Sequence, residues 1–164
     1  MIGGAMVGLQ ATAIKTQLGP LLNGWVNYEF WLPVPKMDFP GVADLITKYQ
    51  AKAAGEGVDA LGYYMAPSGY AQLQVLQQAV EATKSLDDKK IADYVRANSF
   101  KTVLGDVKFG AKGEWAQSRV LQTQFHDIKG NDVEQFRKLT AQSVLTPSEY
   151  KSGDVIYPYE KAHQ

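Results

Sequence analysis

The chain has 164 residues, of which 45% are hydrophobic and 21% charged, which is the composition of a folded globular protein. Lysine plus arginine and aspartate plus glutamate both total 17, so the formal net charge is zero and no strong field attracts nucleic acid. Cysteine is absent, which excludes disulfides, thiolate metal sites and cysteine nucleophiles. The first ten residues carry no positive charge and are interrupted by Gly3, Gly4 and Gly8, so we expect no signal peptide in this chain.

The first quarter of the chain alternates between strand and helix patterns. Residues 2–9 are apolar and rich in glycine without a helical period, which predicts a buried strand followed by a turn. An apolar stripe predicts a helix over residues 12–22, with its last turn distorted by Pro20. Residues 25–32 are rich in aromatic and β-branched side chains and predict a strand that ends before Pro33.

Three helices are predicted in the middle of the chain, over residues 41–54, 67–84 and 85–98. The second has apolar residues around most of its circumference, so we expect it to be largely buried. We expect the three helices to pack as one group beside the strands that begin at Trp25 and Val103.

The last third has a period of two and fewer helical signals. Residues 103–109 and 120–125 predict two strands of a hairpin-like element, with a turn at 110–113, and residues 133–139 predict a short amphipathic turn. The predicted strands are too few to complete a doubly wound sheet, which indicates that part of a sheet is missing.

The sequence offers little that could support catalysis, metal binding or a cofactor. His126 stands beside Asp127, but no nucleophile accompanies it, so we interpret it as a solvated loop histidine, and His163 lies too near the end for a fixed geometry. The aspartates lie beside lysines or at helix starts, where capping explains them. No glycine-rich segment has a phosphate-binding pattern.

Aromatic and apolar residues next to predicted strand ends are the better candidates for a binding site. Trp31, Tyr63, Tyr64, Met65 and Pro67 lie at strand ends or just before a helix, where ligands meet the sheet in α/β proteins. For each of them, packing in the core is the alternative interpretation.

Four segments, taken in order, resemble the carboxy-terminal half of the type I periplasmic solute-binding proteins of branched-chain amino acid and amide ABC importers. They are Ile-Gly-Gly-Ala-Met-Val-Gly-Leu at 2–9, Gly-Tyr-Tyr-Met-Ala-Pro-Ser-Gly-Tyr-Ala at 62–71, Gly-Asp-Val-Lys-Phe-Gly-Ala-Lys-Gly-Glu at 105–114 and Tyr-Pro-Tyr-Glu-Lys at 157–161.

The resemblance implies a partial α/β fold of this family, with a parallel sheet flanked by helices and segments of both lobes. Residues 1–31 would end lobe II, residues 32–114 would form part of lobe I, and residues 115–164 would return to lobe II and form the tail. Trp31 and Pro33 would lie in the hinge between the lobes.

The resemblance also implies a ligand-binding wall formed by Ala5, Met6, Tyr64, Met65 and Pro67. Amino-acid binders of the family hold the ligand ammonium with an acidic residue in the loop that corresponds to residues 3–8, and no acid stands there in this chain. The wall would therefore suit an aromatic or aliphatic carboxylate.

The implied function is that of the solute-binding component of an ABC importer for amino acids, amides or such carboxylates, located in the periplasm and without enzymatic activity. Its partners would be the small-molecule ligand, the permease, and either a missing amino-terminal half or another copy of the chain. Two alternatives stay open, a ligand-sensing domain of a cytoplasmic regulator and a truncated remnant that binds nothing and self-associates. A small α/β enzyme is a third, less favoured alternative.

Overall fold

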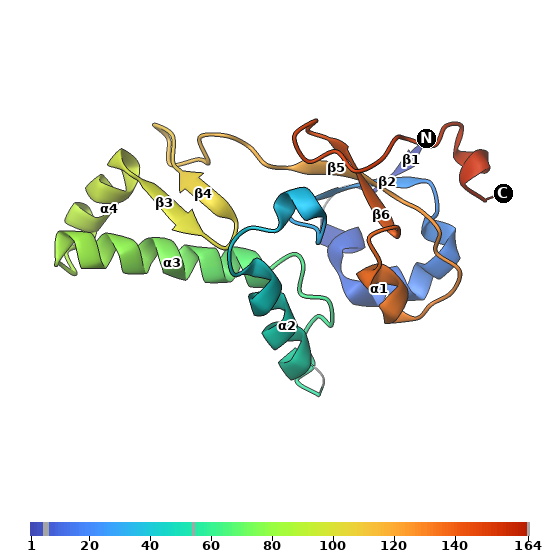
Figure 1. Ribbon diagram of the computed structural model, residues 1–164, viewed down its shortest axis with the longest axis horizontal. Coiled ribbons are helices and arrows are strands. Elements are labelled where there is room, and N and C mark those ends of the chain that lie inside the picture. The colour runs from blue at the N-terminus through green and yellow to red at the C-terminus, as the bar shows by residue number, and fades with distance from the viewer. Residues whose placement is uncertain (5–6, 54, 164) are drawn as a thin grey trace.

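The computed structural model describes residues 1–4, 7–53 and 55–163, and it places a mixed sheet at one end and most of the helices at the other (Figure 1). Both chain termini lie at the sheet end. The sheet has the strand order β1-β2-β5-β6. Its strands are β1 (Ile2–Gly3), β2 (Trp25–Glu29), β5 (Leu121–Phe125) and β6 (Gln142–Thr146).

The α/β class predicted from the sequence is confirmed, and the sheet is mixed instead of parallel. Strands β1 and β2 run parallel, whereas β5 is antiparallel to both β2 and β6. The pairing of Glu29 with Leu121 explains this direction. The chain leaves the sheet after Glu29 and returns at the same edge with Leu121, so β5 must run opposite to β2.

One face of the sheet is covered by the first helix of the chain. Helix α1 (Thr12–Leu18) continues into a 3₁₀ turn at Gly19–Leu22, which contains Pro20 as predicted. Further 3₁₀ turns occupy Val7–Gln10, Pro35–Met37, Val133–Arg137 and Tyr159–His163.

The helical part contains three helices and a β-hairpin. Helix α3 contacts both α2 and α4, so the predicted helix group is present, but β2 belongs to the other sheet. Asp87 caps α4 by accepting a hydrogen bond from the Lys90 amide at 2.9 Å. The elements are α2 (Val42–Ala53), α3 (Ala66–Thr83), α4 (Asp88–Ala97), β3 (Ser99–Thr102) and β4 (Gly105–Lys108).

The predicted hairpin between residues 103–109 and 120–125 is wrong. Strand β4 pairs with β3 across the two-residue turn at residues 103–104, because Gly105 adopts a φ of +78° that closes the chain locally. Strand β5 joins the other sheet instead. Of the strand predicted at 2–9, the described residues show only β1, and Val7–Gln10 form a 3₁₀ turn instead; β6 was not predicted.

The prediction that α3 is largely buried is wrong as well. Its inward face consists of Pro67, Ala71, Val75 and Ala79, whereas Tyr70, Leu73 and Leu76 are between 47% and 64% exposed. We call these three exposed residues the α3 stripe. The hairpin and the two neighbouring helices cover only one side of α3.

The main hydrophobic core runs from the sheet into the helical part. Leu121 and Val144 of the sheet share one buried cluster with Val42 and Ile46 of α2 and with Leu104 of the hairpin. The two parts are therefore packed together, while the lobe boundaries after residues 31 and 114 stay a prediction. In the described part of the chain, no helix is both long and apolar enough to span a bilayer.

Candidate functional site

The candidate site lies at the edge of the sheet where β2 ends. Phe30 follows β2 at this edge, whereas β1 ends earlier, because Gly3 pairs with Val26 near the start of β2. Strand β5 begins at this edge too, since Leu121 pairs with Glu29. In open α/β sheets, ligands bind in the crevice outside the carboxyl ends of the strands.

Three half-buried aromatic rings line this edge, and we call them the aromatic row. Tyr28 and Phe30 are two residues apart, so they project from the same face of the extended chain, and their ring centroids are 5.8 Å apart at 87°. The ring of Tyr64 lies 5.7 Å from that of Phe30. The row combines apolar faces with two phenolic hydroxyls, which suits an organic solute with an apolar group.

Trp31 and Pro33, the predicted hinge residues, line a shared hollow beside α2 with Ile46 and Thr47. Trp31 is buried, and its indole Nε1 donates a hydrogen bond to the carbonyl of Met37 at 3.0 Å. Trp31 is thus fixed in the core where the chain leaves the sheet. The role of both residues in a hinge stays a prediction.

The predicted ligand-binding residues do not all face the same space. Tyr64 joins the aromatic row, whereas Met65 is 65% exposed and lines a hollow between α3 and β4 with Phe109 and Trp115. Pro67 is buried in the first turn of α3. The predicted residues Ala5 and Met6 lie outside the described residues, and the binding role of all five stays a prediction.

A buried ion pair lies beneath the sheet edge, on the opposite face of β2 from Tyr28 and Phe30. Lys15 Nζ of α1 is 3.2 Å from Glu29 Oε1, and the two side chains are only 2% and 1% exposed. This pair was not predicted from the sequence. A signal was present, because Asn27 and Glu29 alternate with Val26 and Tyr28 in an otherwise apolar strand.

Glu29 accepts further hydrogen bonds from the same face of the sheet. Its Oε1 is 3.4 Å from Asn27 Nδ2 and 3.3 Å from Gln142 Nε2, and the latter also donates to Thr123 Oγ1 at 2.7 Å. Burial raises the pKa of the Glu29 carboxyl, although the charge of Lys15 and these hydrogen bonds oppose the shift. One oxygen of the carboxylate is therefore bound by the protein itself, and Glu29 lies on the opposite face of β2 from the aromatic row.

Asp59, in the loop between α2 and α3, caps α1 from outside the helix. Its carboxylate accepts from the amide and the hydroxyl of Thr12, both at 2.7 Å, and from the amides of Leu61 and Gly62 at 3.1 and 2.9 Å. Partial burial raises the pKa of Asp59, but the hydrogen bonds outweigh burial and lower it overall. Asp59 thus ties the helical part to the start of α1.

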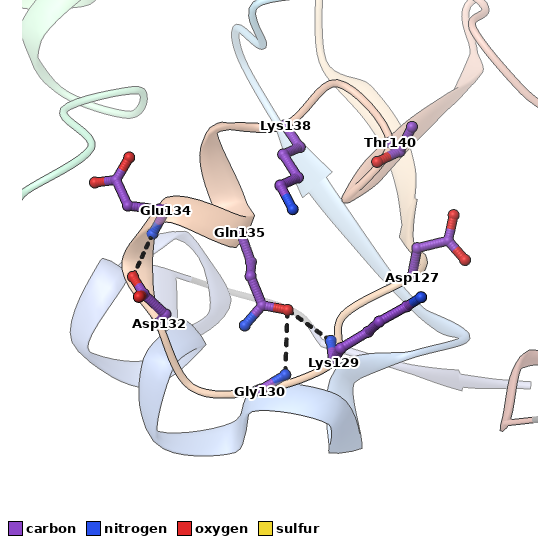
Figure 2. Close-up of a pocket in the computed structure, with 8 residues that line it drawn as sticks. All are labelled: Asp127, Lys129, Gly130, Asp132, Glu134, Gln135, Lys138 and Thr140. Atoms are coloured by element: carbon purple, nitrogen blue, oxygen red, sulfur yellow. Dashed lines mark hydrogen bonds between the residues drawn. The ribbon is translucent and has the colours of Figure 1, made fainter.

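A separate polar hollow lies at the opposite edge of the sheet (Figure 2). Its lining residues come after β5 in the chain. The Gly24 amide donates a hydrogen bond to the Phe125 carbonyl at 2.8 Å, so β2 begins at the edge where β5 ends. Gln135 Oε1 already accepts from the amides of Lys129 and Gly130 at 2.7 and 3.1 Å. Lysines and carboxylates both line the hollow, which gives it no preference for one charge.

His126 adjoins this polar hollow in sequence but offers no catalytic geometry. Its Nε2 is buried without a hydrogen-bond partner, and burial lowers the pKa of its imidazole, opposed by the charge of Asp127. Within the described ranges, no three histidine or carboxylate side chains gather in a way that could hold a metal ion.

No protein-family model matches the chain. It is 31% identical over 126 residues to Leu/Ile/Val-binding protein homolog 2 of Brucella abortus, a match that covers 76% of this chain and 31% of the relative. It is 32% identical over 108 residues to Leu/Ile/Val-binding protein homolog 1 of Brucella suis, which covers 65% of this chain and 27% of the relative. The chain is thus similar to these Leu/Ile/Val-binding protein homologs over part of their length.

The family resemblance predicted from the sequence is thereby confirmed. The match spans about a third of the length of these Leu/Ile/Val-binding protein homologs. A mixed α/β sheet with helices at its side and end is consistent with a partial fold of the periplasmic-binding-protein type.

We predict that Lys15→Met destabilises the protein by about 3–5 kcal/mol, because it leaves the Glu29 carboxylate buried without its cation. The double variant Lys15→Met/Glu29→Leu should recover most of this loss. Urea unfolding at pH 7 measures both. Lys48→Met, which removes an exposed ion pair with Asp44, is the control and should leave the midpoint of unfolding nearly unchanged. Equal losses in the single and double variants would contradict the pair's role.

We predict that Asp59→Asn lowers the free energy of unfolding by about 0.5–2 kcal/mol at pH 7. This is the range observed when a helix loses its cap, and the Asp59 carboxylate that caps α1 is partly exposed. Because the folded pKa of Asp59 lies below its unfolded value, this contribution is complete above the ordinary pKa of about 3.9 and is lost as the pH falls through the folded value. The difference between wild type and variant should therefore shrink in acid. Asp44→Asn is the matched surface control.

Proposed function

We propose that the chain forms one wall of a binding site for a small organic solute, in a protein that delivers this solute to an ABC permease. The observation that carries the proposal is the aromatic row at the carboxyl edge of the sheet, in a chain related to proteins named Leu/Ile/Val-binding protein homologs. Capture would occur by enclosing the solute between this wall and a second one.

The proposed solutes are amino acids, amides and aromatic or aliphatic carboxylates with an apolar group. The relatives are named for leucine, isoleucine and valine, whose side chains are branched and apolar. The half-buried rings of Phe30 and Tyr64 could pack against such a group. Residues 3–8 contain no acid and Glu29 is bound to Lys15, so a second wall would have to supply the partner of an ammonium group.

We further propose that the protein acts in the periplasm, and that it binds without making or breaking bonds. Family resemblance supports the location. A role without catalysis is supported by His126, whose buried Nε2 has no hydrogen-bond partner among the described residues. A ligand sensor built on the same fold is the alternative, and a permease or a regulator encoded beside the gene would decide between them.

Binding can be tested by following the amide resonances of the ¹⁵N-labelled chain while leucine, phenylalanine or benzoate is added. We expect shifts at Phe30 and Tyr64 with a Kd weaker than about 1 mM, about −4 kcal/mol, because one wall buries only part of the solute. Tyr64→Ala should abolish the shifts at Phe30.

Tyr157→Ala is the matched control, since Tyr157 is 65% exposed and belongs to the tail. Absence of shifts in the aromatic row with every solute would overturn the proposed site. Binding at a Kd of about 1 μM would instead show that the chain needs no second wall.

The exposed α3 stripe favours a second proposal, that this surface is covered by a missing amino-terminal half or by another copy of the chain. Helix α3 carries no charged residue from Ala66 to Val80, so no charge would be buried in such a contact. Strand β1 also lies at the edge of the sheet with both residues exposed. Uncovered apolar surface and open strand edges promote association.

For the isolated chain, we expect sedimentation velocity to show dimers or larger species whose fraction grows with concentration. Leu73→Gln combined with Leu76→Gln should shift the distribution toward monomer, because it makes the α3 stripe polar. Leu86→Gln is the control, since Leu86 is 82% exposed but lies beyond the end of α3. A wild-type chain that stays monomeric at all concentrations would contradict self-association.

A further inference from the structure

Arg119 lies where the sheet and the helical part meet. It stands two residues before β5, at the end of the connection formed by residues 109–120. Its guanidinium carbon is 5.4 Å from the ring centroid of Phe39 and 5.3 Å from that of Trp115. A guanidinium within about 6 Å of an aromatic centroid is attracted by the ring. Arg119 therefore links its own connection to Phe39, which lies in the connection from β2 to α2.

The same guanidinium also binds the β3–β4 hairpin. Nη1 donates to the carbonyl of Leu104, and Nη2 donates to the carbonyl of Asp106 at 2.6 Å. Between them, Gly105 leaves room for the stack, since a Cβ at this position would lie 2.9 Å from the Phe39 ring and 3.2 Å from Nη1 of Arg119. The planar fork of an arginine can bind two carbonyls and contact aromatic rings at once, which a lysine cannot do.

The contacts extend to a third segment of the chain. The ring of Phe39 meets that of Tyr150 edge to face, with centroids 6.4 Å apart at 83°. Tyr150 follows β6 and is only 4% exposed. Three segments therefore meet here. Two of them are the connections that join the sheet to the helical part, which contribute Phe39, Trp115 and Arg119. The third is the segment that follows β6, which contributes Tyr150.

We propose that Arg119 is a positioning residue that clamps these segments and so fixes the orientation of the helical part relative to the sheet. Its importance for solute capture rests on the proposed function, because the aromatic row takes Phe30 from the sheet and Tyr64 from the loop before α3, so the spacing of these rings depends on that orientation. Orientation can be measured without any solute, so the two proposals can fail separately.

Spin-label distances test the clamp. The chain has no cysteine, so Leu86→Cys and Glu134→Cys allow specific labelling of one exposed site in each part, 82% and 65% exposed. Arg119→Met keeps the length of the side chain and removes its charge and donors, so we expect a broader or displaced distance distribution. Arg119→Lys should fall between wild type and Arg119→Met.

Hydrogen exchange provides a second measurement within the connection. The amides of Gly110 and Ala116 donate to the carbonyls of Glu114 and Lys108, both at 2.8 Å, and should exchange about tenfold faster in Arg119→Met, which corresponds to about 1.4 kcal/mol. Arg96→Met is the matched control, because Arg96 is exposed and contacts Asp93 of its own helix at 3.6 Å. It should leave both measurements unchanged.

A folded Arg119→Met protein with wild-type distances and exchange would overturn the clamp. If circular dichroism shows that this variant does not fold, Phe39→Leu decides, since it removes one ring and leaves both hydrogen bonds of Arg119 in place. A broader distance distribution in Phe39→Leu supports the clamp, and an unchanged distribution overturns it.

Discussion

The buried ion pair between Lys15 and Glu29 sets the orientation of the residues at the candidate site. Taking two charges out of water is costly unless each has its partner and further hydrogen bonds, so α1 and β2 are held in one relative position. Since side chains alternate along a strand, directing Glu29 toward α1 directs Tyr28 and Phe30 to the other face. The aromatic row is thus a consequence of where the charged residue is buried.

The helical part is attached to this sheet by polar and aromatic contacts as well as by the shared core. Asp59, in the loop before α3, binds the start of α1, and Arg119, just before β5, binds the hairpin. Both side chains are partly exposed, so water can replace their contacts at moderate cost. Such contacts can hold one orientation and still allow another.

The incomplete sheet and the one-sided packing of α3 have the same physical origin. An α/β unit buries its apolar surfaces by placing further strands and helices against them, and the described residues leave β1 at an edge and the α3 stripe in water. The match to about a third of the relatives' length accords with this architecture. The aromatic row at the carboxyl end of β2 has the character expected of one wall of a site that encloses its ligand.

The sequence alone determined the α/β class, the four main helices and the position of β2, because apolar periodicity and capping residues such as Asp87 act locally. The family resemblance was also visible in four short segments of the chain. Sequence did not determine the partner of β5, the existence of β6 or the exposure of α3, because these depend on which distant segments lie beside them. Tyr64 could be proposed for the site from its place before a helix, whereas Phe30 was not, because only the tertiary structure places its ring beside that of Tyr64. The pairs Lys15–Glu29, Thr12–Asp59 and Arg119–Phe39 join residues far apart in the sequence, and only the tertiary structure could bring their charges and rings within contact distance.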